Sequence, residues 1–553
     1  MKKTFLLFIL ALCSVALFAQ NEDWLWAKQA GGISGDKGYS IAVDAYGNSY
    51  ITGYFRESAT FGTTTLTSSS DYGSDIFVAK MDINGNWLWA KQAGGKDYDD
   101  GYSIAVDANG NIYITGYFRE SATFGTTTLT SSGYYEDIFV AKLDINGNWL
   151  WAKQAGGTSH DDGYSIAVDA YGNSYVTGYF KSSSCSFGTI TLNSSGYEDI
   201  FVAKMDSNGN WMWAKQAGGT DYDFGYGIAV DSNGNSYITG GFEESATFGT
   251  TILTSSGGSD IYVAKLDSNG NWLWAKKAGG TSDDGGYSIA VNDNGNSYVT
   301  GYFSESATFG TTTLTSSGDL DIFVAKLDSN GNWLWAKQAG GTGWDEGYSI
   351  AVDDNGNSYV TGYFRDIATF GTTTLTSYGF SDIFVAKLDS NGNWLWAKQV
   401  GGTSYDFGSG IVVDANGNSY VTGYFEESAT FGTTTLTSSG YYDIFVAKLG
   451  EVNSISLPEI ISFSGIRSIY PNPFNPLTTI DYEISMPADV KIEVYNNRGQ
   501  LVRNFILGYK EQGSYKLTWE GKDNNGCLCS TGIYYIRMQA GKEIYIKKAV
   551  LLK

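Results

Sequence analysis

An aspartate recurs seven times along the chain, each time in a loop that follows a Trp-x-Trp-Ala-Lys segment. Carboxylates at equivalent points of a ring could bind cations or hydroxyl-rich ligands, and paired carboxylates can hydrolyse glycosides. Alternatively, each carboxylate could cap backbone N–H groups of its own loop in an Asx-type turn. We favour the turn, because a site usually needs one asymmetric pocket whereas a structural device recurs in every repeat. The residues are Asp36, Asp99, Asp161, Asp223, Asp284, Asp345 and Asp406.

Few other residues could take part in catalysis or bind a metal. His160 is the one histidine of the sequence, which excludes a histidine-based catalytic triad or a multi-histidine zinc site within one chain; we expect it to be a solvated loop residue. Asp-x-Asn-Gly-Asn, as at residues 206–210, 267–271 and 328–332, resembles the start of a calcium loop but lacks the later glutamate. We interpret it as a hairpin turn and expect no catalytic residue, metal site or cofactor, with calcium as the open alternative.

The elements that carry these residues are short strands. Trp-x-Trp-Ala-Lys recurs every 61 to 63 residues, and each unit contains four strand-like segments, for example 287–291, 297–303, 321–327 and 333–337. Asn-Gly between apolar runs is a strong signal for a hairpin, since both residues accept positive φ. A further short strand or hairpin is expected in the segment 307–314. Four antiparallel strands repeated at this period are typical of a β-propeller blade.

The two ends of the repeat array indicate that the propeller is closed. The first Trp-x-Trp strand, residues 24–28, has no preceding partner, and the last Ile-Phe-Val-Ala strand, residues 443–448, has no following Trp-x-Trp. Seven complete blades exist only if the N-terminal strand joins the last blade. Such closure removes the exposed edges of an open array. We therefore predict a seven-bladed β-propeller over residues 21–450.

The repeats also carry a recognisable motif. Asp-x-x-Gly-Asn-x-Tyr-Val-Thr-Gly, as at residues 353–362, is followed by Asp-Ile-Phe-Val-Ala-Lys-Leu, as at residues 382–388. Residues 24–450 thereby resemble the bacterial seven-bladed β-propeller repeat family. The resemblance implies an extracellular repeat protein, and it supports the fold more than any function.

A second domain is predicted at residues 468–553, after a linker at 451–467. All five prolines follow the propeller, and short alternating segments separated by turns predict a small immunoglobulin-like β-sandwich. Tyr-Pro-Asn-Pro-Phe-Asn-Pro at 470–476, the segment from Val494 to Val502 and the basic tail resemble the C-terminal sorting domain of the type IX secretion system. This resemblance implies the type IX secretion machinery as a partner, passage across the outer membrane, a tail that can be cleaved, and attachment to surface glycolipid.

The N-terminus predicts export. Residues 1–20 combine Met-Lys-Lys, an apolar run from Phe5 to Phe18 and Ala19-Gln20, the pattern of a secretory signal peptide. The apolar run is too short for a confident membrane span, and we expect none in the mature chain. The net charge of −23 argues against nucleic-acid and anionic-lipid partners. We expect a secreted or outer-surface protein.

These features favour an all-β, non-enzymatic binding or adhesion module whose propeller face takes a glycan or protein ligand. Near-identical blades could add weak contacts through multivalency. The alternatives are an extracellular polysaccharide-active enzyme that uses loop carboxylates, and a purely structural surface component.

Overall fold

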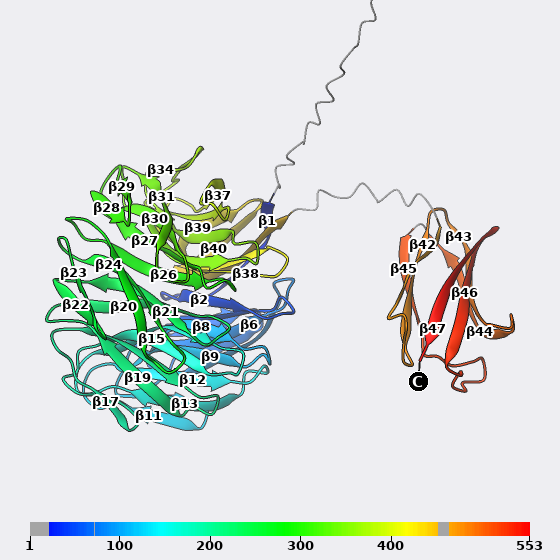
Figure 1. Cartoon of the computed structure of the whole chain (residues 1–553), viewed down its shortest axis with the longest axis horizontal. Helices are drawn as coiled ribbons and strands as arrows, with labels where there is room; N and C mark the ends of the chain where they lie inside the picture. The colour runs from blue at the N-terminus through cyan, green and yellow to red at the C-terminus, as the bar shows by residue number, and fades with distance from the viewer. Residues whose placement is uncertain (1–21, 71, 452–463, 512, 553) are drawn as a thin grey trace, which may run out of the picture. The chain divides into compact units, whose positions relative to one another are not determined.

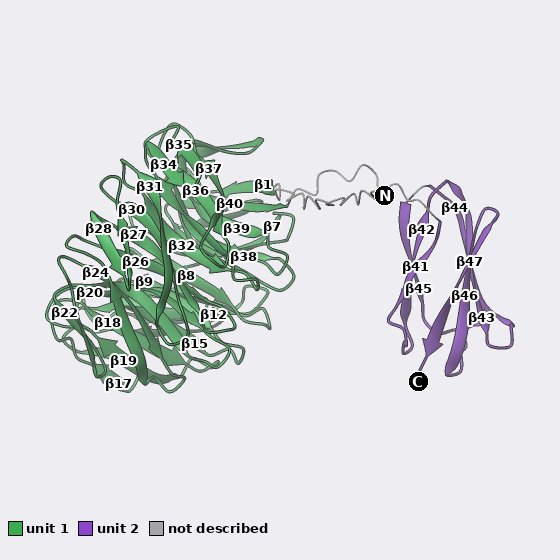
Figure 2. Ribbon diagram, turned by 45° about the horizontal axis from the view of Figure 1, so that its top comes forward, with its two compact units in different colours: residues 1–452 green, residues 453–553 purple. Residues whose placement is uncertain are grey.

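The computed structural model describes residues 22–70, 72–451, 464–511 and 513–552, and these residues form strands and turns without any helix. The chain divides into two compact units, residues 1–452 and 453–553 (Figure 2). The predicted signal peptide and most of the predicted linker lie outside the described residues. No helix that could cross a membrane was found in the described part of the chain.

The first unit is a ring of seven antiparallel blades of four strands each (Figure 1), and in one of them β31 (Trp333–Gly341) also pairs with the hairpin strand β34 (Ile367–Phe370), which makes a six-stranded sheet. The innermost strands are β2 (Lys37–Val43), β8 (Asp100–Val106), β14 (Asp161–Val168), β20 (Asp223–Val230), β26 (Gly285–Val291), β32 (Glu346–Val352) and β38 (Asp406–Val413). The second strands are β3 (Ser49–Phe55), β9 (Ile112–Phe118), β15 (Ser174–Phe180), β21 (Ser236–Phe242), β27 (Ser297–Phe303), β33 (Ser358–Phe364) and β39 (Ser419–Phe431).

The third strands are β6 (Asp75–Met81), β12 (Asp137–Leu143), β18 (Asp199–Met205), β24 (Asp260–Leu266), β30 (Asp321–Leu327), β36 (Asp382–Leu388) and β40 (Thr434–Glu451). The outer strands are β7 (Trp87–Ala93), β13 (Trp149–Ala155), β19 (Trp211–Ala217), β25 (Trp272–Ala278), β31 (Trp333–Gly341), β37 (Trp394–Val400) and β1 (Glu22–Ala30). The third strands are apolar on both faces because neighbouring blades cover them from both sides.

Short hairpins at the blade edges connect the second and third strands, as the sequence predicts for the segment 307–314. They are β4 (Ser58–Phe61) with β5 (Thr64–Thr67), β10 (Ser121–Phe124) with β11 (Thr127–Thr130), β16 (Cys185–Phe187) with β17 (Ile190–Leu192), β22 (Ser245–Phe248) with β23 (Thr251–Thr254), β28 (Ser306–Phe309) with β29 (Thr312–Thr315), and β34 (Ile367–Phe370) with β35 (Thr373–Thr376). In the last blade the hairpin continues from β39 into β40.

The ring closes between the two ends of the repeat array. Strand β1 pairs antiparallel with β40, with Ala27 opposite Ala447 and Ala30 opposite Ile444, and the last sheet has the order β1-β40-β39-β38. This pairing confirms the predicted closure by the N-terminal strand. The paired strands come from residues more than 400 positions apart, so the propeller has no open sheet edge at this seam.

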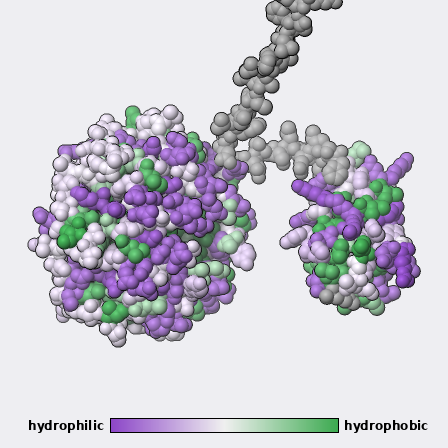
Figure 3. Space-filling model, viewed as in Figure 1, coloured by the Kyte–Doolittle hydropathy of each residue, from purple (hydrophilic) through white to green (hydrophobic). Residues whose placement is uncertain are grey.

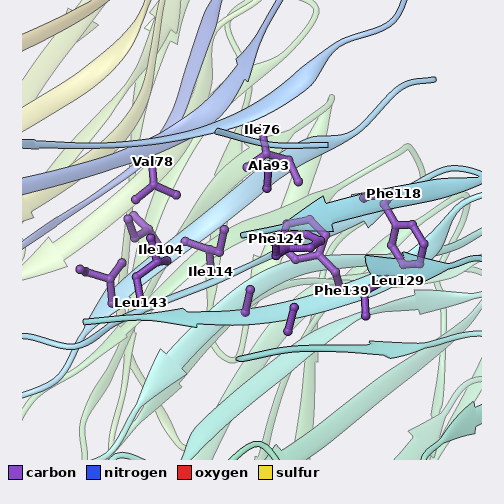
Figure 4. Close-up of a cluster of buried hydrophobic side chains, with 14 of the residues drawn as sticks. Ile76, Val78, Ala93, Ile104, Ile114, Phe118, Phe124, Leu129, Phe139 and Leu143 are labelled. Carbon is purple, nitrogen blue, oxygen red and sulfur yellow. The ribbon is translucent and has the colours of Figure 1, made fainter. Parts of the chain in front are cut away.

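The hydrophobic core lies between adjacent blades. One cluster joins Ile76 and Val78 of β6 to Ile104 of β8 and Phe139 of β12 (Figure 4). Burying each such side chain contributes about 1.5–3 kcal/mol. The repeated tryptophans extend this packing outward, since Trp149 lies edge-on against Phe124 at 5.3 Å between ring centroids. Leu150, between the two tryptophans of its motif, is 52% exposed, as the alternation of a strand requires.

The second unit is the predicted β-sandwich. One sheet contains β41 (Gly465–Tyr470), β42 (Thr478–Ile484) and β45 (Gly513–Trp519), and the other has the order β44 (Leu501–Lys510), β43 (Ala488–Asn496), β46 (Gly532–Ala540), β47 (Glu543–Leu551). Its core includes Ile492, Trp519 and Ile536. In Figure 3 hydrophobic residues also gather on the visible surface of this unit.

The boundary of this domain lies earlier than the sequence predicts. Strand β41 begins at Gly465, within the segment 451–467 that we expected to be a linker. Ile466 is buried and pairs with Tyr482 of β42, so the first strand needs these residues to complete its sheet.

Candidate binding face of the propeller

The seven recurrent aspartates lie inside the fold and do not form an exposed rim. All seven are completely buried. Asp99 shows the arrangement: its Oδ2 accepts a hydrogen bond of 2.6 Å from the backbone N–H of Gly95, and its Oδ1 accepts one of 3.1 Å from the backbone N–H of Arg119. Asp36 accepts equivalent bonds of 2.7 Å from Gly32 and 3.0 Å from Arg56. The side chain therefore caps its own loop and also ties it to the residue that follows the second strand of the next blade.

A second buried aspartate accompanies each of these residues. A Cβ atom at Gly94, whose φ is 149°, would lie 2.8 Å from Oδ1 of Asp75 and 3.1 Å from Oδ2 of Asp99. Only a glycine lets the two carboxyl groups approach in this way. Six of the second aspartates open the third strands of their blades, and the seventh lies within β40; they are Asp75, Asp137, Asp199, Asp260, Asp321, Asp382 and Asp443.

Burial changes the acidity of these pairs. It raises the pKa of Asp99 to about 8, against the lowering effect of two backbone N–H donors, and the neighbouring Asp75 raises it further. Burial likewise raises the pKa of Asp406 to about 8 and of Asp36 to about 7. Carboxyl groups that keep a proton near neutral pH attract cations weakly. Within the described ranges no group of three His, Cys, Asp or Glu side chains could hold a metal ion.

The aspartate loops hold a second set of loops in place. The backbone N–H of Asp99 donates a hydrogen bond of 2.9 Å to the carbonyl of Ser74, and that of Asp223 donates one of 2.9 Å to Glu198. Ser74 and Glu198 lie in the loops that lead into the third strands, and Glu198 forms a parallel bridge with Tyr222. Each aspartate loop is thus paired with the loop that enters the third strand of a neighbouring blade.

These paired loops carry exposed aromatic side chains, which we call the aromatic rim. Tyr98, Tyr222 and Trp344 each precede a recurrent aspartate and are 37%, 37% and 46% exposed. From the paired loops come Tyr197, 54% exposed, and Phe380, 62% exposed. The position before the aspartate varies around the ring, and its residues are Gly35, Tyr98, His160, Tyr222, Asp283, Trp344 and Tyr405.

A ring of tyrosines surrounds the central channel on the same face. Adjacent members have centroids 5.3–5.5 Å apart, and Ser409 stands in the seventh position. The ring borders a polar cavity of about 160 Å³. Its tyrosines are Tyr39, Tyr102, Tyr164, Tyr226, Tyr287 and Tyr348.

Rows of stacked rings run inward from the rim, and one of them reaches this inner ring. Tyr197 and Tyr222 are nearly parallel at 5.0 Å, Tyr222 and Phe224 lie 6.4 Å apart, and Phe224 stacks on Tyr226 at 5.6 Å. A similar row consists of Phe380, Tyr405 and Phe407, with 4.8 and 6.4 Å between successive centroids.

Arginines add charge at the rim, since the guanidinium of Arg365 lies 5.3 Å from the ring centre of Trp344 and that of Arg56 lies 5.6 Å from Tyr98. The face thus presents apolar rings, hydroxyl groups and charged donors together. Such surfaces bind ligands that combine apolar and hydrogen-bonding groups.

The sequence pattern points to the recurrent aspartates and not to this face. The residue just before each recurrent aspartate differs from repeat to repeat and is aromatic in several of them, as at Tyr98 and Trp344. This variation is the feature of the sequence that could have indicated the face.

The structure also shows the surroundings of His160 and of the Asp-x-Asn-Gly-Asn segments. The Nδ1 atom of His160 lies against the carboxylate of Glu136, and its ring lies 4.3 Å from that of Tyr135, although its side chain is 40% exposed. The Asp-x-Asn-Gly-Asn segments are hairpin turns, as predicted: Oδ1 of Asp206 accepts hydrogen bonds of 2.9 Å from the backbone N–H groups of Asn208 and Asn210.

Fold and repeats together define a protein class. Residues 476–543 match the FlgD Ig-like domain family. Six segments match the Beta-propeller repeat family, at residues 25–54, 88–117, 150–179, 213–240, 334–363 and 395–424. The chain is therefore an all-β protein that joins a seven-bladed β-propeller to a C-terminal Ig-like domain.

Two curated proteins are similar in sequence. The chain is 25% identical over 503 residues to an uncharacterized WD repeat-containing protein, L264, of Acanthamoeba polyphaga mimivirus, with 73% of this chain and 36% of that protein covered. It is 26% identical over 375 residues to regulatory protein FlaEY of Caulobacter vibrioides, with 63% and 38% covered. The chain thus spans little more than a third of the length of these relatives.

Solved structures with low similarity to this chain include an oxidase and a secretion-system component. A fungal alcohol oxidase of the AA5 family, in complex with copper, has a TM-score of 0.40 at 12% identity, with 96% of this chain and 100% of that chain covered. PorZ, a surface component of the type-IX secretion system of Porphyromonas gingivalis, has a TM-score of 0.18 at 11% identity, with 95% and 100% covered. Neither similarity bears on the function of this chain.

Proposed function

We propose that this protein is a non-enzymatic binding module that displays the aromatic rim and tyrosine ring of its propeller to a glycan or protein ligand outside the cell. The observation that carries the proposal is the gathering of exposed aromatic side chains, such as Tyr222 and Trp344, on loops of one face. Exposed aromatics supported by a rigid scaffold are typical of binding surfaces.

The position of the carboxyl groups supports a binding role over catalysis. A glycosidase needs two carboxyl groups that flank a substrate bond, one of them as proton donor. The recurrent aspartates have suitably raised pKa values, but all are buried beneath their loops and hydrogen-bonded to backbone N–H groups. A substrate would have to unfold the loop pairs to reach them.

The C-terminal sandwich would direct the protein to the outer surface. We propose that residues 1–20 act as a signal peptide and that the C-terminal domain is the sorting signal for type IX secretion. The second unit has its own hydrophobic core and is compact by itself, which suits a domain that is recognised, and can be cleaved, independently of its cargo.

Binding of the full-length protein to a glycan array, with and without calcium, tests the binding function. Selective binding without release of sugar products supports a binding module. Hydrolysis that disappears when one recurrent aspartate is replaced by asparagine would contradict it. Absence of any selective ligand would instead favour a structural surface component.

Export can be tested separately. Deleting residues 464–553 removes the whole sandwich and should leave the propeller in the periplasm of a cell that has the type IX machinery. Fractionation followed by surface protease treatment measures this distribution. Normal surface display of the truncated protein would refute the sorting role, whatever the propeller binds.

A further inference from the structure

Six of the seven blades end in a hairpin whose tip packs on the preceding blade. At residues 206–210 the carbonyl of Ser207 accepts hydrogen bonds of 3.3 Å from Nε1 of Trp151 and 3.2 Å from Nζ of Lys142. The glycine of the same turn, Gly209, lies against the ring of Trp151, where a Cβ atom would be 3.0 Å from Cδ2. Equivalent tryptophan contacts reach the carbonyls of Ile83, Ser268, Ser329 and Ser390.

The seam of the ring lacks this hairpin, because β40 and β1 belong to opposite ends of the repeat array. Nε1 of Trp396, which occupies the position of Trp151, is consequently buried without a hydrogen-bond partner. Lys387, its cross-strand neighbour, lines a cavity of about 470 Å³ at this place, which we call the seam cavity. The seam cavity lies at the end of the blades opposite the aromatic rim.

The walls of the seam cavity are acidic. Five carboxylates and one lysine line it: Glu22, Asp353, Asp354, Asp414, Glu451 and Lys387. Glu22 is only 4% exposed; its Oε1 accepts a bond of 2.9 Å from Nζ of Lys387, whereas its Oε2 is buried without a partner. Glu22 also stands directly opposite Glu451 in the β1–β40 register. A buried carboxylate oxygen without a donor is costly, so Oε2 of Glu22 favours a further cation.

The shape of the cavity indicates which kind of cation. A divalent metal ion needs several oxygens at 2.0–2.6 Å, and no three carboxylates converge in that way among the described residues. The carboxylates are instead spread over a cavity large enough for a small organic molecule. Tyr359, Val352 and Val413 add apolar surface between them. An extended molecule with several separated positive charges matches this arrangement.

We propose that the seam cavity binds an aliphatic polyamine, with ammonium groups paired to Oε2 of Glu22 and to the exposed carboxylate of Asp354. The methylene chain would lie beside the apolar wall. This site is separate from the aromatic rim, so the proposal does not depend on the proposed function. Because the ligand would bridge β1, β38 and the turn that ends β32, it would also strengthen the closure of the ring.

Isothermal titration of the full-length protein with spermidine at low ionic strength tests the proposal. We expect one binding site, and an affinity that falls about two- to fivefold in Asp354→Asn, as for loss of one exposed charge pair. Asp293→Asn is the matched control: Asp293 holds the same exposed turn position one blade earlier, where a hairpin fills the seam. This control should bind spermidine like the wild type.

Three outcomes would overturn the proposal. They are the absence of binding, an equal loss of affinity in both variants, which would indicate attraction to acidic surface in general, and displacement of spermidine by equimolar calcium, which would indicate a metal site. A Glu22→Gln variant provides a second test, because it removes the negative charge of the buried carboxylate whose Oε2 has no partner. This variant should bind spermidine more weakly than Asp354→Asn does. Spermidine should also raise the melting temperature of this variant less than that of the wild type.

Discussion

Asp75 and Asp99 meet across Gly94, and the same pair of buried carboxyl groups recurs between the other blades. A carboxyl group without solvent prefers its neutral form, and a second one close by strengthens that preference. The pair therefore stabilises the loops, and its carboxyl groups have raised pKa values. Its value to the protein lies in the loops it fixes, because Asp99 is hydrogen-bonded to Gly95, Arg119 and Ser74 through its side chain and backbone.

This acidity predicts how stability depends on pH. Burial raises the pKa from 3.8 to about 6 in Asp443, about 7 in Asp36 and about 8 in Asp99. Since the folded pKa exceeds that of the unfolded chain, the folded state holds these protons more tightly, and its stability falls as pH rises from about 4 to about 8; above pH 6 the fall comes from the groups with the higher pKa values, such as Asp36 and Asp99. We expect a lower melting temperature of the propeller at pH 9 than at pH 6, measured by calorimetry.

A variant with one fewer titrating group serves as the control for this effect. Asp99→Asn should make the decline between pH 6 and pH 9 shallower. A melting temperature that stays constant or rises over this interval in the wild type would show that the buried pairs are ionised in the folded state.

The outer hairpins are the elements that join one blade to the next. Every tip places a glycine against the tryptophan of the preceding blade, and five of the six also accept its indole N–H on a carbonyl, as Gly392 and Ser390 do for Trp335. The sequence showed these turns clearly, because Asp-Ser-Asn-Gly-Asn has strong hairpin chemistry. Their role between blades was not apparent, since it depends on residues about 55 positions away.

Trp335, which has this hairpin contact, and Trp396, which lacks it at the seam, give a matched pair of variants. Trp335→Phe removes an indole N–H that donates to Ser390 at 3.3 Å, so it should cost about 1 kcal/mol beyond the loss of ring area. Trp396→Phe removes an N–H that has no partner and should cost less. Chemical denaturation of the two variants measures the difference; a larger cost for Trp396→Phe would contradict our description of the seam.

At the scale of the whole molecule, the sequence was sufficient for the architecture and insufficient for the site. Seven repeats, their four strands and the closure by residues 24–28 followed from periodicity within one chain. The burial of Asp99 or Asp223 did not, because a loop pair from two blades covers each residue. The exposed rings of Tyr197 and Tyr222 meet for the same reason: their loops are adjacent only once the ring has formed.

If the aromatic rim is the binding surface, replacing one of its rings must weaken binding, whereas replacing an exposed ring elsewhere must not. Glycan-array binding of the full-length protein is measured for the wild type, Tyr222→Ala and Tyr171→Ala. Tyr171 is 83% exposed but lies in a hairpin turn at the opposite end of the blades. We predict that Tyr222→Ala weakens binding at least about fivefold, as for a residue central to an interface, while Tyr171→Ala binds like the wild type. Equal binding by all three proteins, or loss only in Tyr171→Ala, would contradict the claim.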